Sequence, residues 1–138
     1  MQTELTKKNA FINYTGWALQ IISAVIMLQT LFFKFTASPE SVYIFSTLGA
    51  EPFGRIFSGI VELIASVLLL TRSWSWLGAG IAAGTMFGAL IAHLTILGIV
   101  VMNDGGELFL LGCIVFVSSI IILLIRRKNI NIFGFRFS

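Results

Sequence analysis

Four long apolar runs, separated by shorter polar segments, dominate the chain. They cover about residues 11–33, 55–71, 76–102 and 108–125. Each run has roughly the length at which an α-helix, rising ~1.5 Å per residue, crosses the ~30 Å hydrocarbon core of a bilayer. The connections at 72–75 and 103–106 are short, so consecutive runs are expected to be antiparallel. The pattern predicts one all-α domain over residues 1–138, an integral membrane four-helix bundle.

The longest connection, residues 34–54, contains the signals of a short helix at 38–49, SPESVYIFSTLG. Ser38 can cap its start, Pro39 suits the first helical position, and Gly49 can end it. The apolar side chains of this helix would let it lie along the membrane interface. We therefore expect residues 34–54 to cover one end of the bundle as a lid.

Small residues recur at every fourth position in the third run. Gly80, Gly84 and Gly88 lie on one stripe of the expected helix, and Ala92 continues it. Such a stripe lets the backbone of a second helix approach closely within a membrane. We interpret it first as a packing feature of the bundle and second as a surface for a homo-oligomer.

Composition and charge narrow the class of protein further. The chain is 57% hydrophobic and only 11% charged, with a mean hydropathy of +0.98, which excludes an ordinary soluble domain. Its basic residues cluster at the ends of the runs, so they indicate membrane orientation and not a nucleic-acid partner. The side with both termini and the 72–75 turn has seven basic residues, and the other side has only Lys34 and Arg55. The positive-inside rule therefore predicts cytoplasmic termini and an outward-facing lid.

Two ionisable side chains interrupt the apolar runs at a similar depth. Glu62 lies seven residues after Arg55, roughly 10 Å along the helix, and His93 lies nine residues before Met102, roughly 13 Å. An ionisable residue inside a span costs at least ~2.5 kcal/mol on insertion scales and is by default a functional candidate. We expect Glu62 and His93 in one polar layer beneath the lid, and we take them as the candidate catalytic, proton-handling residues.

Three further residues are candidates for ligand binding in the same layer. Lys34 and Arg55 would supply positive potential, and Gln29 would join them from the first span. The amides of Gln20 and Gln29 are otherwise expected to bond across to a neighbouring helix. A purely structural interpretation also stays open, in which Glu62 pairs with a buried histidine and the basic side chains extend to the outer surface.

The sequence gives little support for a metal site, for a nucleotide-binding or nucleophile motif, or for disulfide chemistry. One histidine, one cysteine and one buried carboxylate do not make a convincing metal set, so no metal site is predicted. The phosphate loop, the nucleophile elbow and the dinucleotide fingerprint are all missing from the sequence. Cys113 has no second cysteine with which to form a disulfide in one copy, and we interpret it as a small apolar filler. These residues do not decide whether the chain is an enzyme.

Four short segments carry a resemblance to a known family. They are KFT at 34–36, PES at 39–41, FSTLG at 45–49 and GIVEL at 59–63. Their order and spacing resemble the DoxX-like family of small four-helix membrane proteins, over about residues 15–125. The resemblance implies a bacterial inner-membrane protein, similar to a subunit of a thiosulfate:quinone oxidoreductase. The chain departs from redox-type relatives because it lacks a cysteine pair.

These inferences lead to a first hypothesis and two alternatives. The first is an accessory or quinone-interacting subunit of a membrane redox system, with a quinone as the candidate cofactor and a membrane or extracytoplasmic redox protein as the partner. The second is a non-catalytic scaffold or assembly partner. The third is a carrier of a small polar solute, which would have to be an oligomer because four short spans leave little room for a pathway.

Overall fold

The computed structural model describes residues 2–127, 131–132 and 135–136, and it is almost entirely helical, as the apolar runs predict. Its elements are α1 (Gln2–Phe35), α2 (Pro39–Thr47), α3 (Phe53–Leu69), α4 (Ser75–Ala92), the π-helical η1 (His93–Leu97), α5 (Glu107–Ile125), β1 (Asn131–Ile132) and β2 (Phe135–Arg136). The two short strands pair antiparallel near the C-terminus. Lys128, which contributes to the predicted orientation, lies outside the described residues.

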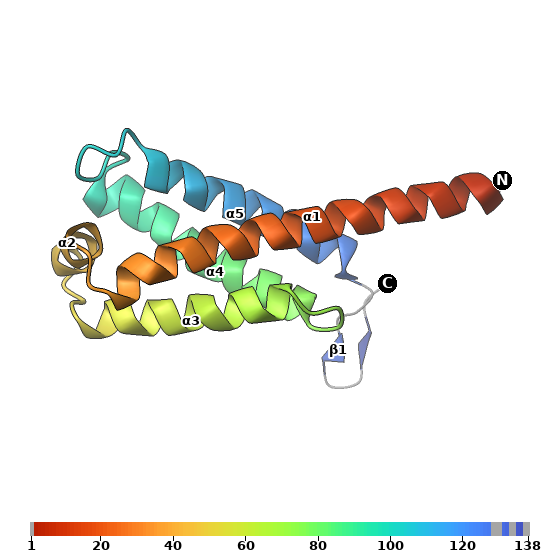
Figure 1. The fold of residues 1–138 in the computed structure, drawn as a ribbon, viewed down its shortest axis with the longest axis horizontal. Helices are drawn as coiled ribbons and strands as arrows, with labels where there is room; N and C mark the ends of the chain where they lie inside the picture. The colour runs from red at the N-terminus through yellow and green to blue at the C-terminus, as the bar shows by residue number, and fades with distance from the viewer. Residues whose placement is uncertain (1, 128–130, 133–134, 137–138) are drawn as a thin grey trace.

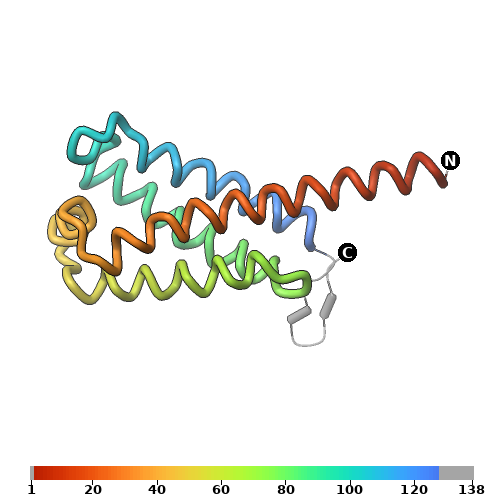
Figure 2. Tube along the Cα trace, in the orientation of Figure 1, coloured from red at the N-terminus to blue at the C-terminus, as the bar shows by residue number. Residues whose placement is uncertain are grey.

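The four long helices are arranged so that each packs against two others. Helix α1 contacts α3 and α5, and α4 contacts the same two helices from the other side (Figure 1). Consecutive long helices run in opposite directions, as the short connections predict. The first third of α1 projects beyond the other helices, and α2 lies at the opposite end (Figure 2). In Figure 2 the projecting part of α1 is red and α2 is orange.

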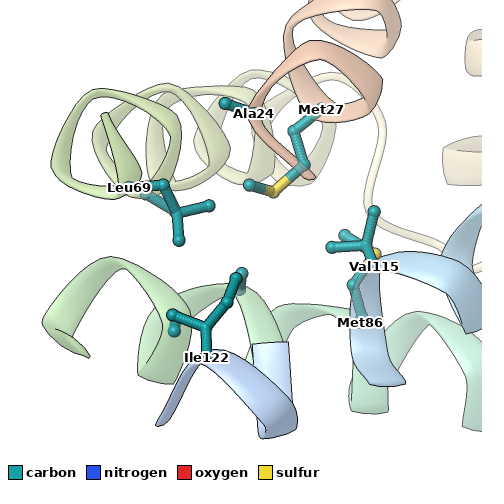
Figure 3. Packing of buried hydrophobic residues seen from close by; sticks show 9 residues of the cluster. Ala24, Met27, Leu69, Met86, Val115 and Ile122 are labelled. Atoms are coloured by element: carbon teal, nitrogen blue, oxygen red, sulfur yellow. The ribbon is translucent and has the colours of Figure 1, made fainter. Parts of the chain in front are cut away.

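Small and flexible side chains fill the space between the long helices. Ala24 and Met27 of α1 face Leu69 of α3, while Met86 and Ile122 approach from α4 and α5 (Figure 3). Most other buried apolar positions are alanines: Ala65, Ala79, Ala82 and Ala83. Small side chains let helix backbones come close, which increases dispersion contacts where hydrophobic driving force between helices is weak.

At Gly78 the backbone of α4 approaches the backbone of α3 closely, and this contact does not involve the predicted glycine stripe. A Cβ atom at Gly78 would lie 2.7 Å from the backbone nitrogen of Leu69. By contrast, Gly80, Gly84 and Gly88 are exposed, and a Cβ at each would meet nothing within 4 Å. The expectation that this stripe packs inside the chain is wrong, because α4 turns a different face, centred on its alanines, toward its neighbours.

The lid helix forms as its end signals predict. The Ser38 side chain accepts a hydrogen bond from the backbone N–H of Ser41 at 3.3 Å, and Pro39 begins the helix. Gly49 follows the helix with φ +73°, a conformation that favours glycine because it has no Cβ. This part of the sequence prediction is confirmed.

Two helix boundaries differ from the prediction. Helix α1 begins at Gln2 and not near residue 11, where the first apolar run starts, so the polar residues before that run extend the helix. The third apolar run stops being helical at Leu97, not at Met102, because Gly98 has φ +82° and leaves the helical conformation. His93 is therefore close to the end of its helix.

Three segments are long and apolar enough to cross a membrane: α1, the continuous segment Ser75–Leu97, and α5. Helix α3 has 17 residues and is shorter than these three. The sequence predicts four membrane spans. Among the described residues, three helical segments have the length and composition of a span.

We expect Gly78→Ala to lower the free energy of unfolding by about 1–3 kcal/mol, because the new methyl group would overlap backbone atoms that cannot move aside cheaply. Gly84→Ala is the matched control on the same helix, and its methyl group would enter open space. The control should be neutral or stabilising by up to about 1 kcal/mol. Thermal unfolding in mild detergent measures both, and equal melting temperatures for the two variants would contradict the Gly78 contact.

Candidate functional site

A cavity of about 290 Å³ lies at the end of the long helices where α2 is located. Its walls come from all five α-helices and η1, and most of them are apolar. Met27, Met86 and Val115 belong both to the cavity wall and to the core, so the cavity borders the packed interior directly. The polar side chains along the walls are Thr30, Lys34, Glu40, Ser41, Ser58, Glu62, Thr85 and His93.

Glu62 is held by an ion pair with Lys34. The Lys34 ammonium donates to Glu62 Oε1 at 2.6 Å, and the two side chains are 15% and 4% exposed. Thr30 Oγ1 lies 3.4 Å from the other carboxylate oxygen. The sequence prediction placed Lys34 among candidate ligand-binding residues or at the outer surface, and the structure places it inside the cavity wall. A buried carboxylate with an ammonium partner avoids most of the cost of an isolated buried charge.

Lys34 also connects the ion pair to the lid helix. Its Nζ atom lies 5.8 Å from the centroid of the Phe45 ring, a distance at which an ammonium is attracted to an aromatic face. Phe45 belongs to α2 and lines the same cavity. One ammonium therefore contacts α3 through Glu62 and α2 through Phe45, which places the lid against the charged part of the cavity.

Arg55 and Gln29 lie outside the cavity wall. Arg55 is buried and donates from Nε to both Glu51 carboxylate oxygens at 2.9 and 3.0 Å, and from Nη1 to the Lys34 carbonyl oxygen. It therefore ties the start of α3 to the end of α1. Gln29 is exposed, and Thr30 takes the expected place beside Glu62. Successive helical side chains differ by about 100° in direction, so a shift of one residue moves the side chain off the cavity face.

His93 lines the cavity with one ring nitrogen already engaged. Its Nδ1 lies 2.9 Å from the carbonyl oxygen of Gly98. A carbonyl oxygen can only accept, so Nδ1 carries the proton, and in the neutral ring Nε2 is an acceptor. Within residues 2–127, Nε2 has no hydrogen-bond partner. The ring is 5% exposed and meets the edge of Phe109 at a centroid distance of 5.7 Å.

Glu62 and His93 share the cavity, but within the described part of the chain no hydrogen bond joins them. Glu62 is satisfied by Lys34 and Thr30, and His93 by the Gly98 carbonyl. The interpretation of the two residues as one hydrogen-bonded pair is therefore not what the geometry provides. Glu62 and His93 each line the cavity, and each has its own hydrogen-bond partners.

Asp104 organises the loop next to His93, and sequence reasoning did not single it out. Its Oδ1 accepts from the backbone N–H groups of Val101 and Gly106 at 3.0 and 2.8 Å, and Oδ2 accepts from Leu108 at 3.2 Å. Burial by itself would raise the pKa of Asp104, but these backbone N–H groups outweigh it and hold the pKa below its usual value. The aspartate–glycine turn signal could have indicated this role.

Glu40 shows the opposite electrostatic effect at the same end of the molecule. Partial burial raises the pKa of its carboxyl group, and the nearby carboxylates of Asp104 and Glu107 raise it further. Within the described residues there is no group of three or more His, Cys, Asp or Glu side chains that could hold a metal ion. Cys113 is half-buried and does not line the cavity.

Comparison with known proteins does not assign a family. The chain matches no family model, no curated protein and no solved structure. The cavity must therefore be interpreted from its own chemistry, which combines an apolar wall, one buried ion pair and one imidazole nitrogen acceptor.

We expect Lys34→Met to lower the free energy of unfolding by about 3–5 kcal/mol, because it leaves the Glu62 carboxylate buried without a cation. The double variant Lys34→Met with Glu62→Gln should recover most of that loss, since neither position then carries a charge. Chemical unfolding in detergent, analysed as a double-mutant cycle, measures the coupling. Additive effects of the two substitutions would show that the ion pair does not contribute to stability.

The two shifted carboxyl groups predict opposite pH effects. Asp104 has a lowered pKa in the folded protein, so its contribution is present above the unfolded value of about 3.9 and is lost as the pH falls through the folded pKa. Asp104→Asn should therefore lower the melting temperature near pH 7, and its deficit should shrink below about pH 4.

Glu40→Gln is the counterpart with the opposite sign. Because the folded pKa of Glu40 is raised, its ionisation costs stability at neutral pH, and the substitution should raise the melting temperature there. The gain should disappear below about pH 4.3, where the carboxyl group is protonated in both states. Melting curves of both variants between acid and neutral pH test the pair, and shifts of the same sign would contradict it.

Proposed function

We propose that the chain is a DoxX-like integral membrane protein whose four long helices form a bundle in the bacterial inner membrane. The three apolar segments support this topology, and α3 would be the fourth span, about 25 Å long at 17 residues. Its exposed face is apolar, with Ile60, Ile64 and Val67 each about half exposed. The short length of α3 is within the range that bilayers accommodate by thinning. Both termini would be cytoplasmic and α2 would face outward.

Within that topology, the cavity would bind a small molecule with an apolar ring and polar oxygen substituents, and we propose a quinone. The carrying observation is that the Lys34–Glu62 ion pair and His93 line one mainly apolar cavity, and that Nε2 of His93 has no hydrogen-bond partner within residues 2–127. An ammonium has three N–H donors, and only one is used by Glu62, so Lys34 can donate to a quinone carbonyl oxygen. Nε2 can accept from a quinol hydroxyl group.

The size and wall chemistry of the cavity fit this ligand class. About 290 Å³ is near the lower limit of small-molecule sites, enough for a quinone ring but not for a long isoprenoid tail. The tail would extend between helices into the lipid. Converting a quinone to a quinol takes two electrons and two protons. The electrons would come from a partner redox protein, and Glu62 and His93 would exchange the protons, so the chain would serve as an accessory subunit.

One observation favours the alternative of a non-catalytic scaffold or assembly partner. Gly80, Gly84 and Gly88 form an exposed stripe of α4 that no other described residue covers, although Gly88 also lines the cavity. A stripe of this kind suits a second helix, from another copy or from a different membrane protein. A carrier of small polar solutes would require the same contact, because it depends on an oligomer.

We expect a short-chain ubiquinone or menaquinone analogue to bind the purified protein, and Thr30→Leu to weaken this binding by about 10-fold or more. The leucine fills part of the cavity with a larger apolar side chain and removes a hydroxyl group that lies 3.4 Å from the Glu62 carboxylate, and a loss of about 1.4 kcal/mol in binding corresponds to a factor of 10. Gln29→Leu is the matched control, since it places the same side chain one position away on the exposed face. Native mass spectrometry in mild detergent measures the bound analogue and the oligomeric state together.

Glu62→Gln completes the test. In the ligand-binding proposal it weakens retention of the quinone analogue while the protein still melts cooperatively. If neither analogue binds the wild type and Glu62→Gln only lowers the melting temperature, the quinone proposal is wrong. A homo-oligomer observed in the same spectra would then support the assembly alternative.

A further inference from the structure

A second hollow lies between α1 and α5, far from the cavity beneath α2. It is a surface groove at the end of α5, where the first part of α1 begins to project past the other helices (Figure 1). One wall comes from residues 9–15 of α1, and the other comes from residues 121–127, at the end of α5 and just beyond it. Five of the ten lining residues are apolar, and the polar ones are Asn9, Asn13, Thr15, Arg126 and Arg127.

Arg126 is held in place by three neutral partners. Its Nε donates to Gln20 Oε1 at 2.8 Å, Nη1 donates to Asn13 Oδ1 at 2.7 Å, and Nη2 donates to the Asn13 carbonyl oxygen at 3.2 Å. Gln20 is itself fixed, because its Nε2 donates to the Leu69 carbonyl oxygen at 2.7 Å. The guanidinium carbon also lies 5.7 Å from the Trp17 ring centroid. The side chain is therefore pre-organised by contacts from α1 and α3.

Gly16 provides the space that this arrangement needs. A Cβ atom at position 16 would lie 2.7 Å from Nη2 of Arg126. The glycine thus allows the guanidinium to lie directly against the α1 backbone. A single methyl group at this position would displace the charge without removing it, which offers a selective way to test what the charge does.

Within residues 2–127, the positive charge in the groove has no counter-charge. No carboxylate in residues 2–127 lies within 4.0 Å of Arg126 or Arg127, and the one hydrogen bond of Arg127 goes to the Leu124 carbonyl oxygen at 3.3 Å. Arg126 has five N–H groups, of which three are used, so one remains on each terminal nitrogen. Within residues 2–127, the basic residues near this end are Lys7, Lys8, Arg72, Arg126 and Arg127, and the acidic residue near it is Glu4.

We propose that this groove binds an anionic glycerophospholipid, with the phosphate of its headgroup at Arg126 and Arg127. Two remaining guanidinium N–H groups suit the paired oxygens of a phosphate, and basic pockets between membrane helices are a recurrent form of lipid recognition. An acyl chain would lie along the apolar wall formed by Ile121, Leu124 and Ile125. The inference rests on the proposed membrane insertion and places this site in the cytoplasmic leaflet.

The test uses the full chain, purified in mild detergent and mixed with equal amounts of dioleoyl phosphatidylglycerol and dioleoyl phosphatidylcholine. Native mass spectrometry then counts the molecules of each lipid that stay bound. We expect the wild type to retain phosphatidylglycerol preferentially. Arg127→Gln should reduce that retention about 5-fold, the effect of one basic residue near a lipid headgroup. Gly16→Ala should reduce it as well, and Arg126→Gln should reduce it by about 10-fold. Arg72→Gln is the control, because it removes an equal charge at the same end but outside the groove.

Each outcome supports or overturns the proposal. Equal retention of the two lipids, or equal losses for Arg127→Gln and Arg72→Gln, would overturn a defined site and leave only general attraction by basic charge. Displacement of phosphatidylglycerol by millimolar glycerol phosphate would show a soluble phosphate ligand and would also overturn it. If Arg126→Gln fails to fold, Arg127→Gln and Gly16→Ala decide the result. Extraction of cell membranes with alkaline carbonate separately tests membrane insertion, so that loss of lipid selectivity in an inserted protein rejects only the lipid site.

Discussion

The Lys34–Glu62 ion pair is the interaction on which the end of the molecule with α2 depends. A carboxylate buried among apolar helices requires a nearby cation, and that requirement determines how the end of α1 must lie against α3. The same ammonium lies near the Phe45 ring, so it also draws α2 over the cavity. Arg55 adds to this arrangement by binding the backbone at Lys34 and the side chain of Glu51. The cavity and its lid are thus consequences of satisfying one buried charge.

The two ends of the molecule handle charge in different ways. At the end with α2, carboxylates find opposite charges or backbone N–H groups within the chain, as Glu62 and Asp104 do. At the other end, the partners of Arg126 within residues 2–127 are all neutral. A protein whose charges are satisfied internally at one end and left open at the other is asymmetric in what it can bind. The enclosed end suits a small neutral molecule with an apolar body, and the open end suits an external anion.

The helical class, the antiparallel order and the capped helix α2 could be predicted from the sequence, because they depend on run length and on local signals such as Ser38 and Pro39. The rotation of each helix could not. In a membrane-type sequence the outward face is as apolar as the buried face, so hydropathy did not distinguish Thr30 from Gln29 or the alanine face of α4 from its glycine stripe. The end of the helical segment Ser75–Leu97 was also not predicted, because Gly98 lies within an apolar run and no polar residue marks the boundary. Glu62 and His93 were found because ionisable residues are rare in such runs.

The cavity is assembled from helices at both ends of the sequence, and this has a consequence for how the protein is made. Lys34 and Glu62 can pair as soon as α3 leaves the ribosome, which would shield both charges while the chain is still growing. The walls from α4, η1 and α5, including His93, arrive only with the second half of the chain. In the proposed membrane topology, a nascent intermediate would therefore have a paired charge but an open cavity, and binding competence would appear only at the final step of biosynthesis.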